Sequence, residues 1–490
     1  MTKIIRYLTL ILVILMLLPL IAGCKNGGED NESKLVSGPE GFVPHLGKAD
    51  YSGKTLRVLA SHKDAVFGAS QIAPIENESE IVNDAFMNRN DKLEEEYGFK
   101  IEAIYTDSFD KFTARVKDDI FAGSDDYDVI SSGVMALAPL VTENILIDLK
   151  TIEGSHLRLD QEWWDVASHS GFTIGNKLFF ATGDIFVTDD ENTVVTYFNK
   201  DLISKYNLDS PYTLVKEGTW TLDRMYEMAK TVAKEDGDGE MNVTGNDVWG
   251  LVGGAFEAYK YILGCNCPQV FKDENDIPYL GMTQEKSIDA CTKVFEMFTD
   301  RSTTAYIEQY YAWDHADASK VVDNFYSGQA LFYAAFMYTV NSGKMRETKV
   351  NYGILPQPKF DENQEKYTST INPYAFYCLS ITNQEHDLDF ITFALEAMAY
   401  TSRVLVTPEY YQRTLQLKRF DDEESPEMLD IIFQNRIVDL SVIYNWSDCI
   451  QWYNKMLFSK NNNVVSFVEG RKSAFDKELQ ETIDSILSRD

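Results

Sequence analysis

Apolar positions between residues 55 and 131 alternate between the period of a strand and the period of a helix. Side chains on one face recur every second residue in a strand and every third or fourth residue in a helix. We therefore expect strands at 55–60, 99–105 and 127–131, with helices at 80–97 and 109–121 between them. Strands that alternate with helices imply a parallel sheet covered by helices, so the pattern predicts an α/β fold.

The rest of the chain carries strands and helices in a less regular order. Between 193 and 232 the pattern predicts a strand, a short helix, a loop that contains Pro211 and a second helix capped by Thr221. We also expect a strand pair around Gly175-Asn176 and a helix over 383–403. Further expected elements are a strand that runs into Gly253-Gly254, a helix and strand over 321–336, two tryptophan-bearing helical stretches over 429–458, and a closing helix with Phe475, Leu479 and Ile483 on one face.

The N-terminus has the pattern of a secretory signal. Lys3 and Arg6 precede an apolar run over 7–21, which predicts a signal peptide at 1–23. A transmembrane anchor is the alternative, but the run is short for a membrane span. Residues 20–24 look like a bacterial lipobox, whose cysteine, here Cys24, is diacylated and becomes the first mature residue. Because two acyl chains anchor a protein stably, we expect the mature protein on the extracytoplasmic face of the cell membrane.

Composition bears on the number of lobes, the class of partner and the state of the cysteines. Residues 24–50 are polar and rich in Gly, Asn, Glu and Ser, so we expect a flexible tether. The roughly 440 residues that follow exceed what one core usually organises, which favours two lobes. The net charge of −32 argues against nucleic acid as a partner. Apart from Cys24 there are five cysteines, an odd number, so buried unreactive thiols are expected rather than a disulfide framework.

Three motifs resemble signatures of extracellular solute-binding proteins of the maltose-binding type. The first runs from Tyr197-Phe198-Asn199-Lys200-Asp201 through Pro211 to Thr219-Trp220, with a loop longer than usual. The others are 144–149 and the strand exit at 352–358. The resemblance implies a two-lobe periplasmic-binding-protein-like fold with a ligand cleft between lobes joined by hinge crossings. It also implies a substrate-binding lipoprotein of an ABC importer, which captures a sugar or oligosaccharide and delivers it to permease subunits.

The resemblance also implies a division of the chain. Lobe 1 would comprise 51–185 and 376–412, and lobe 2 would comprise 190–375 and 413–490, with 184–192 as the first hinge crossing. Hinge closure would bury the ligand, because the ligand makes its better contacts in the closed state.

Candidate ligand contacts are carried over as loop positions. Loops beyond the carboxyl ends of strands, such as 61–64 and 131–134, are where ligands of α/β sheets bind. Asp184 is expected to bind hydroxyl groups, and Phe336, Tyr338 and Trp452 are expected to stack on sugar rings. The full set of expected ligand-binding residues is Lys63, Ser132, Asp184, Phe186, Phe256, Phe336, Tyr338, Trp446 and Trp452. Trp220, in contrast, is expected to pack at the start of a helix.

Catalytic motifs are absent from the sequence. It contains no His-Glu-x-x-His, no Gly-x-Ser-x-Gly and no phosphate-binding glycine loop, so we expect no catalytic residues, no enzyme activity and no cofactor. Two alternatives remain: a secreted glycoside hydrolase, whose paired carboxylates leave no mark in sequence spacing, and a ligand-sensing lipoprotein that acts on a membrane receptor.

One acidic loop resembles a structural calcium site. Its oxygen ligands would be Asp236, Asp238, Glu240, Asn242 and Asp247, at roughly alternate positions. Met241 stands where an EF-hand has its turn glycine. A solvated acidic turn is therefore the alternative.

Overall fold

The structure is a computed structural model that describes residues 41–61, 71–74, 81–106, 108–310, 315–411 and 424–489. It divides into an N-terminal unit, residues 1–47, and a unit of residues 48–490 that contains all the described helices and strands. In the described part of the first unit, Leu46 and Gly47 donate backbone hydrogen bonds to the carbonyl of Val43. No described helix combines the length and the apolar character needed to cross a membrane.

The first sheet contains four strands in the order β11-β3-β1-β2. Strand β1 (Thr55–Ala60) pairs in parallel with β2 (Lys100–Tyr105) and β3 (Val129–Gly133), and β11 (Tyr377–Ser380) is antiparallel to β3. The intervening helices are α2 (Ile81–Tyr97), η3 (Phe109–Lys111), α3 (Phe112–Ala122) and α4 (Val134–Thr142). The predicted α/β alternation is confirmed.

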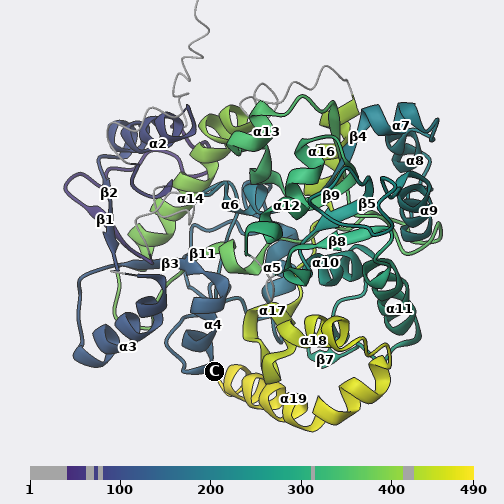
Figure 1. Ribbon diagram of the computed structural model, residues 1–490. Coiled ribbons are helices and arrows are strands. Elements are labelled where there is room, and N and C mark those ends of the chain that lie inside the picture. Colours follow the sequence, from purple (N-terminus) through teal and green to yellow (C-terminus); the bar gives the residue numbers. More distant parts are fainter. Residues whose placement is uncertain are drawn as a thin grey trace, which may run out of the picture. The chain divides into compact units, whose positions relative to one another are not determined.

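The second sheet contains five strands in the order β10-β4-β9-β5-β8. Their bounds are Val194–Asn199 (β4), Trp249–Gly253 (β5), Thr304–Tyr306 (β8), Ala330–Phe336 (β9) and Tyr352–Leu355 (β10). Strand β5 is parallel to β8 and β9, whereas β4 is antiparallel to β9 and β10. Figure 1 shows this group of strands apart from β1–β3, as a two-lobe fold requires.

Helices pack against the second sheet, and a separate pair of short antiparallel strands lies in the same part of the chain. Asn199 accepts hydrogen bonds from the amides of Asp201 and Leu202 and so caps α7, and Thr221 caps α9 as predicted. The elements are α7 (Lys200–Lys205), α8 (Pro211–Lys216), α9 (Leu222–Val232), α10 (Glu257–Gly264), β6 (Val270–Lys272), β7 (Pro278–Leu280), α11 (Glu285–Thr299), η4 (Ile307–Gln309), α12 (His315–Tyr326), η5 (Met337–Asn341) and α13 (Gly343–Glu347).

The C-terminal helices contact elements of both sheet groups. Helices α17 and α19 pack against α4, which follows β3 of the first sheet, and α18 packs against α10 and α11, which lie between β5 and β8 of the second sheet in the chain. Their bounds are Glu424–Gln434 (α16), Leu440–Tyr444 (α17), Trp446–Gln451 (η7), Trp452–Ser459 (α18) and Val464–Leu487 (α19). Figure 1 shows α19 as the yellow helix at the bottom of the molecule.

Three chain segments lie side by side between the two sheets. The first contains α6 (Thr188–Glu191), the second contains η6 (Pro373–Ala375), and the third is 435–437. The amide of Asn372 donates to the carbonyl of Asn192 at 2.9 Å, and the amide of Ile437 donates to the carbonyl of Ser369 at 2.8 Å. We refer to these segments as the crossing.

Three local expectations were wrong. Pro211 begins helix α8 rather than lying in a loop, because proline is tolerated at the first helical position. The expected strand pair at 174–180 is only a single bridge between Ile174 and Lys177. The helix expected over 383–403 is α14 (Leu388–Leu405), which begins five residues later, where Asp387 accepts a hydrogen bond from the amide of Phe390.

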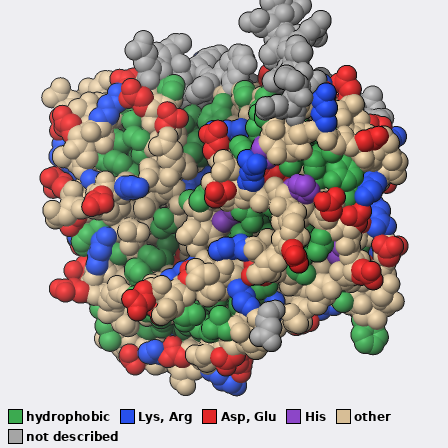
Figure 2. All heavy atoms as spheres, turned by 180° about the vertical axis from the view of Figure 1, so that it is seen from behind, with side chains coloured by type: hydrophobic (Ala, Val, Ile, Leu, Met, Phe, Trp, Pro, Cys, Tyr) green, Lys and Arg blue, Asp and Glu red, His purple; other side chains and the backbone are tan. Residues whose placement is uncertain are grey.

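Acidic side chains are spread over the face of the molecule drawn in Figure 2, where they are interspersed with Lys and Arg. The five cysteines of the described chain outside the signal segment are free and buried, as expected, and burial raises the pKa of thiols such as Cys291 and Cys378. Cys24 lies outside the described residues.

Candidate functional site

The carboxyl ends of three strands meet at one edge of the second sheet. Because β5 runs parallel to both β8 and β9, the segments that follow these strands lie at the same edge. These segments are 254–256, η4 and η5. An edge of this kind is where α/β sheets bind ligands.

Aromatic rings gather at this edge. The rings of Phe336 and Tyr338 stack nearly in parallel, with centroids 5.4 Å apart and planes inclined by 14°. Phe256 lies 6.2 Å from the ring of Tyr374, which belongs to η6 of the crossing. Tyr338 and Tyr374 are 45% and 47% exposed, which leaves part of each ring open to a ligand. Tyr374 was not predicted, because only the fold brings η6 to this sheet edge.

A buried ion pair lies next to these rings. The Nζ of Lys260 is 2.6 Å from Oε1 of Glu257 and 3.7 Å from the ring centroid of Phe336. Both residues belong to α10, the helix that follows β5. Burial lowers the pKa of Lys260 and raises that of Glu257, while the attraction between the two groups opposes both shifts. The cation covers one face of Phe336, so Tyr338 offers the more open ring.

Polar side chains at the same edge either hold the loops or lack partners. Glu308, in η4, accepts a hydrogen bond from the amide of Ala255 at 2.7 Å and so ties the end of β5 to the end of β8. In contrast, three buried atoms make no hydrogen bond within the described structure: Oε2 of Glu257, Nε2 of Gln309 and Oδ1 of Asn341. A buried polar atom without a partner costs free energy, and ligand hydroxyls can supply the missing bond.

The corresponding edge of the first sheet offers Ser132. Its hydroxyl oxygen is buried, with no hydrogen-bond partner in the described chain, and so is that of Ser131. Ser132 faces Cys378 of β11 across the strand pair. Lys63, expected to lie near it, falls outside the described residues.

Asp184 and Phe186 lie at the start of the crossing. The hydroxyl of Thr407 donates to Oδ1 of Asp184 at 2.7 Å, and Arg403 lies 3.5 Å from Oδ2. Burial raises the pKa of Asp184 to about 7, although Arg403 and Thr407 oppose the shift. The ring of Phe186 is only 1% exposed, so it packs in the core and does not present the face that was expected to contact a ligand.

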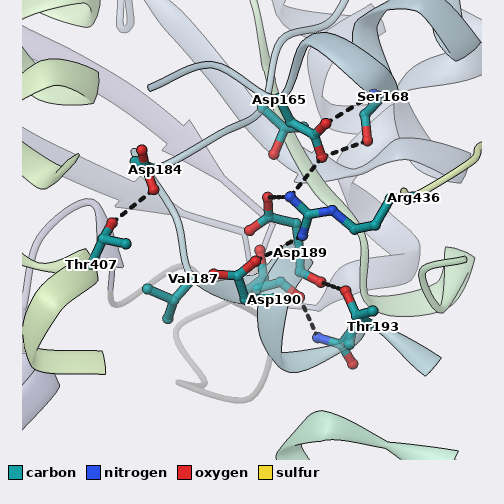
Figure 3. Close-up of polar contacts among 12 residues, drawn as sticks. Asp165, Ser168, Asp184, Val187, Asp189, Asp190, Thr193, Thr407 and Arg436 are labelled. Carbon is teal, nitrogen blue, oxygen red and sulfur yellow. Dashed lines mark hydrogen bonds and ion pairs between the residues drawn. The ribbon is translucent and has the colours of Figure 1, made fainter. Parts of the chain in front are cut away.

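A buried arginine gathers carboxylates beside Asp184. Arg436 lies 3.0 Å from Asp165, 3.3 Å from Asp189 and 2.8 Å from Asp190 (Figure 3). We call these four residues the Arg436 cluster. Asp165 caps α5 (Val166–Phe172), Asp189 and Asp190 belong to α6, and Arg436 lies on the third crossing segment. Sequence reasoning missed the cluster because its members come from distant segments, although the paired aspartates at 189–190 stood within the expected hinge.

Trp446 and Trp452 are part of the hydrophobic core. The indole N–H of Trp446 donates to the hydroxyl of Thr482, and that of Trp452 donates to the carbonyl of Ser447. The rings are 3% and 0% exposed and pack against Phe475 of α19. The prediction that these rings cover a ligand is wrong, because both rings pack against α19. Trp220, as expected, is fully buried and donates to the carbonyl of Pro356.

The acidic loop is held by its own backbone. Asp247 is fully buried and accepts hydrogen bonds from the amides of Asp236 and Asn242 at 2.8 and 2.5 Å. Asp238 accepts from the amide of Glu240 at 2.9 Å. The carboxylates close enough to share an ion are Glu235, Asp236 and Asp247, of which two were predicted ligands. The acidic turn is thus formed by hydrogen bonds, and a structural calcium stays a prediction.

Solved structures of similar fold were found. A cyclo/maltodextrin-binding protein complexed with maltotetraose has a TM-score of 0.55 at 13% identity, over 90% of this chain and 98% of that one. The cyclic α-maltosyl-1,6-maltose binding protein from Arthrobacter globiformis has a TM-score of 0.53 at 12% identity, over 89% and 98%. The maltose-binding periplasmic protein MalE from Listeria monocytogenes, in complex with maltose, has a TM-score of 0.51 at 17% identity, over 89% and 99%.

Sequence comparison identifies the family. No curated protein sequence matches this chain significantly. Residues 75–399, however, match the family described as bacterial extracellular solute-binding protein, and this match covers most of both sheets. Together with the two-lobe α/β fold, it means that the chain belongs to the bacterial extracellular solute-binding protein family.

Proposed function

We propose that this protein captures a carbohydrate outside the bacterial cell and delivers it to the permease of an ABC importer. The observation that carries the proposal is the pair of exposed rings, Tyr338 and Tyr374, beside the buried Glu257–Lys260 pair. Sugar rings have apolar faces that stack on aromatic rings, and their hydroxyls require polar groups in place of water.

The unpartnered polar atoms support a hydroxyl-rich ligand. Glu257 offers an acceptor, Gln309 offers a donor and Asn341 offers an acceptor, each on a segment that follows a different strand. A hydroxyl group can both donate and accept, so a sugar could satisfy all three. A purely apolar ligand would leave them without partners.

The proposed contacts form two groups. On the lobe 2 side they are Phe256, Phe336, Tyr338, Tyr374 and the unpartnered atoms of Glu257, Gln309 and Asn341. On the lobe 1 side we retain Ser132, Asp184 and Lys63 from the sequence-based set. Phe186, Trp446 and Trp452 are left out because their rings are buried in the core.

We propose that closure about the crossing traps the ligand. Lobe 1 would comprise 51–185 and 376–412, and lobe 2 would comprise 190–375 and 413–490. The strand pairing of β11 with β3 supports the return to lobe 1. Small-angle scattering should then show a smaller radius of gyration with a bound glycan, and an unchanged curve at saturation would count against closure.

Similar structures suggest which glycans to test first. Those reported above hold maltotetraose or maltose, or are named for a cyclic maltosyl-maltose. Linear and cyclic α-glucans are therefore the first probes, followed by other neutral oligosaccharides. The family and these structures are binding proteins, so the glycan should be recovered intact after incubation; its hydrolysis would instead favour the glycoside hydrolase alternative.

The decisive experiment combines a thermal-shift screen with calorimetry. A ligand that binds only the folded state raises the melting temperature, so at least one glycan should do so. For that glycan we expect Tyr338→Ala to weaken binding about tenfold, the equivalent of ~1.4 kcal/mol, and Tyr338→Phe to preserve it. Tyr279→Ala is the matched control, because Tyr279 is 42% exposed but lies on the separate β6–β7 pair. No response to any glycan, or equal loss in both alanine variants, would contradict the proposal.

A further inference from the structure

The Arg436 cluster contains more buried acid than base. One guanidinium faces three carboxylates, and the four side chains are between 5% and 12% exposed. If all three aspartates were ionised, the cluster would carry two negative charges away from water. Burial of uncompensated charge is costly, and a carboxyl group in such a site takes up a proton instead.

The three aspartates differ in their other contacts. Asp165 accepts hydrogen bonds from both the amide and the hydroxyl of Ser168, at 2.9 and 2.7 Å, which stabilise its ionised form. Asp190 accepts a hydrogen bond from Arg436 at 2.8 Å. Asp189 has only the ion pair with Arg436, at 3.3 Å, as a side-chain contact in the described structure. Asp189 is therefore the member least able to hold a negative charge.

Asp184 adds a fourth carboxyl group next to the cluster. One of its oxygens is buried without a hydrogen-bond partner among the described residues. Its cation, Arg403, is 40% exposed and is shared with Glu162. Figure 3 shows Asp184 on the segment that leads into Asp189 and Asp190.

Few other groups of the described chain supply positive charge near the cluster. Arg89 of α2 donates to the carbonyls of Gln71, Ile72 and Ile185 and carries no carboxylate partner in the described chain. His169 accepts from the amide of Thr182 and has a pKa lowered by burial, so it is neutral. Among the described residues, the titratable or charged groups that face the four aspartates are His169, Cys378, Arg403, Tyr411 and Arg436.

We propose that the folded protein holds at least one proton among Asp184, Asp189 and Asp190 at neutral pH, which makes the crossing a proton-linked latch. These carboxyl groups lie where the crossing connects the two sheet groups. The bound proton removes the repulsion between their negative charges. Loss of that proton loosens the crossing without any change in bound ligand. This inference does not depend on the sugar proposal, since it concerns the protein alone.

The direction of the pH effect follows from proton linkage. Burial raises the pKa of Asp189 and Asp190, and that of Asp184 to about 7, above the value of 3.8 for free aspartate. The folded state then binds more protons than the unfolded state. Stability therefore falls as pH rises from about 4 to about 7 or above, and the folding equilibrium constant changes tenfold per pH unit for each extra proton.

The test is a carbon NMR titration of protein labelled at the aspartate carboxyl carbons, without ligand. We expect at least one carboxyl resonance to titrate above pH ~6, and to be lost in Asp189→Asn, Asp190→Asn or Asp184→Asn. If every aspartate of the folded wild type titrates below pH ~5, the proposal is overturned. The wild-type titration requires no variant, so it decides the matter even where a variant does not fold.

Thermal unfolding supplies a second readout. Asparagine resembles the protonated acid but does not titrate. The melting temperature of Asp189→Asn minus that of the wild type should therefore increase as the pH rises from ~5.5 to ~8. Asp91→Asn, an exposed position on α2, is the control and should show a constant difference. A constant difference for Asp184→Asn, Asp189→Asn and Asp190→Asn alike would contradict the latch.

Discussion

At the scale of single residues, the candidate site depends on side chains whose neighbours define their role. Lys260 neutralises Glu257 and also covers the ring of Phe336, although the three lie on two different elements. Gly183 is needed for a different reason: it has a φ of +152°, and a Cβ there would lie 2.5 Å from the carbonyl of Trp163. The roles of Lys260 and Gly183 can be tested without knowledge of the ligand.

Replacement of Lys260 by Met should destabilise the protein by about 3–5 kcal/mol, because Glu257 would be left as an unpaired buried charge. Adding Glu257→Gln should restore part of the loss. Chemical unfolding of the single and double variants measures both effects. Lys230→Met removes an exposed lysine that lies over Tyr226, and it should change stability by less than about 0.5 kcal/mol. A similar small effect for Lys260→Met would show that the buried pair contributes little.

Gly183→Ala should lower the free energy of unfolding by more than about 1 kcal/mol, because the new methyl group meets backbone atoms and the φ is unfavourable for alanine. Gly343→Ala is the control, since nothing lies within 4 Å of the added Cβ at the start of α13. Urea unfolding of both variants distinguishes the two cases, and equal stability would contradict the close approach at Gly183.

At the scale of elements, the acidic loop between α9 and β5 shows how one carboxylate can organise a turn. Asp247, near the end of the loop, accepts amide hydrogen bonds from Asp236, near its start, and from Asn242, in its middle. These bonds hold the turn whose acidic pattern resembles a calcium loop, and calcium at this turn stays a prediction.

Asp247→Ala should destabilise the loop by about 1–3 kcal/mol for each amide left without an acceptor. The effect should be the same in calcium and in a chelator, as measured by thermal unfolding. Asp238→Ala, at an exposed position of the same loop, should have a small effect. A wild-type melting temperature that rises with calcium and falls with chelator would instead support the calcium interpretation.

At the scale of the whole molecule, the predicted lipid anchor and the net charge bear on where the protein acts. The family is extracellular, and the sequence predicts a lipid anchor at Cys24. The net charge of −32 keeps such a body away from anionic surfaces, so attachment would rely on the acyl chains rather than on surface contacts.

Cys24→Ala should therefore release the protein from the membrane fraction into the soluble extracytoplasmic fraction. Removal of both acyl chains eliminates the apolar area that holds it there. Detergent phase partition and incorporation of labelled palmitate measure the change. Ser33→Ala, in the tether, should leave the distribution unchanged. Retention of Cys24→Ala in the membrane would favour an uncleaved transmembrane anchor.

The sequence by itself determined the features that depend on neighbours along the chain. The period of apolar residues located β1, α2, β2, α3 and β3, and Thr221 marked the start of α9, because periodicity and capping are local. The resemblance to the solute-binding family then singled out positions at the ends of strands, and so Phe256, Phe336 and Tyr338 became candidates.

Only the tertiary structure decided which of those side chains are exposed to solvent and which charged side chains form ion pairs. Trp452 and Tyr338 were equally plausible platforms in the sequence, but one is fully buried against α19 and the other is 45% exposed. Arg436 meets Asp165 across about 270 residues of chain, a pairing that carries no local signal. Burial and long-range charge pairing are properties of packed elements, and so they emerge only when the elements are assembled.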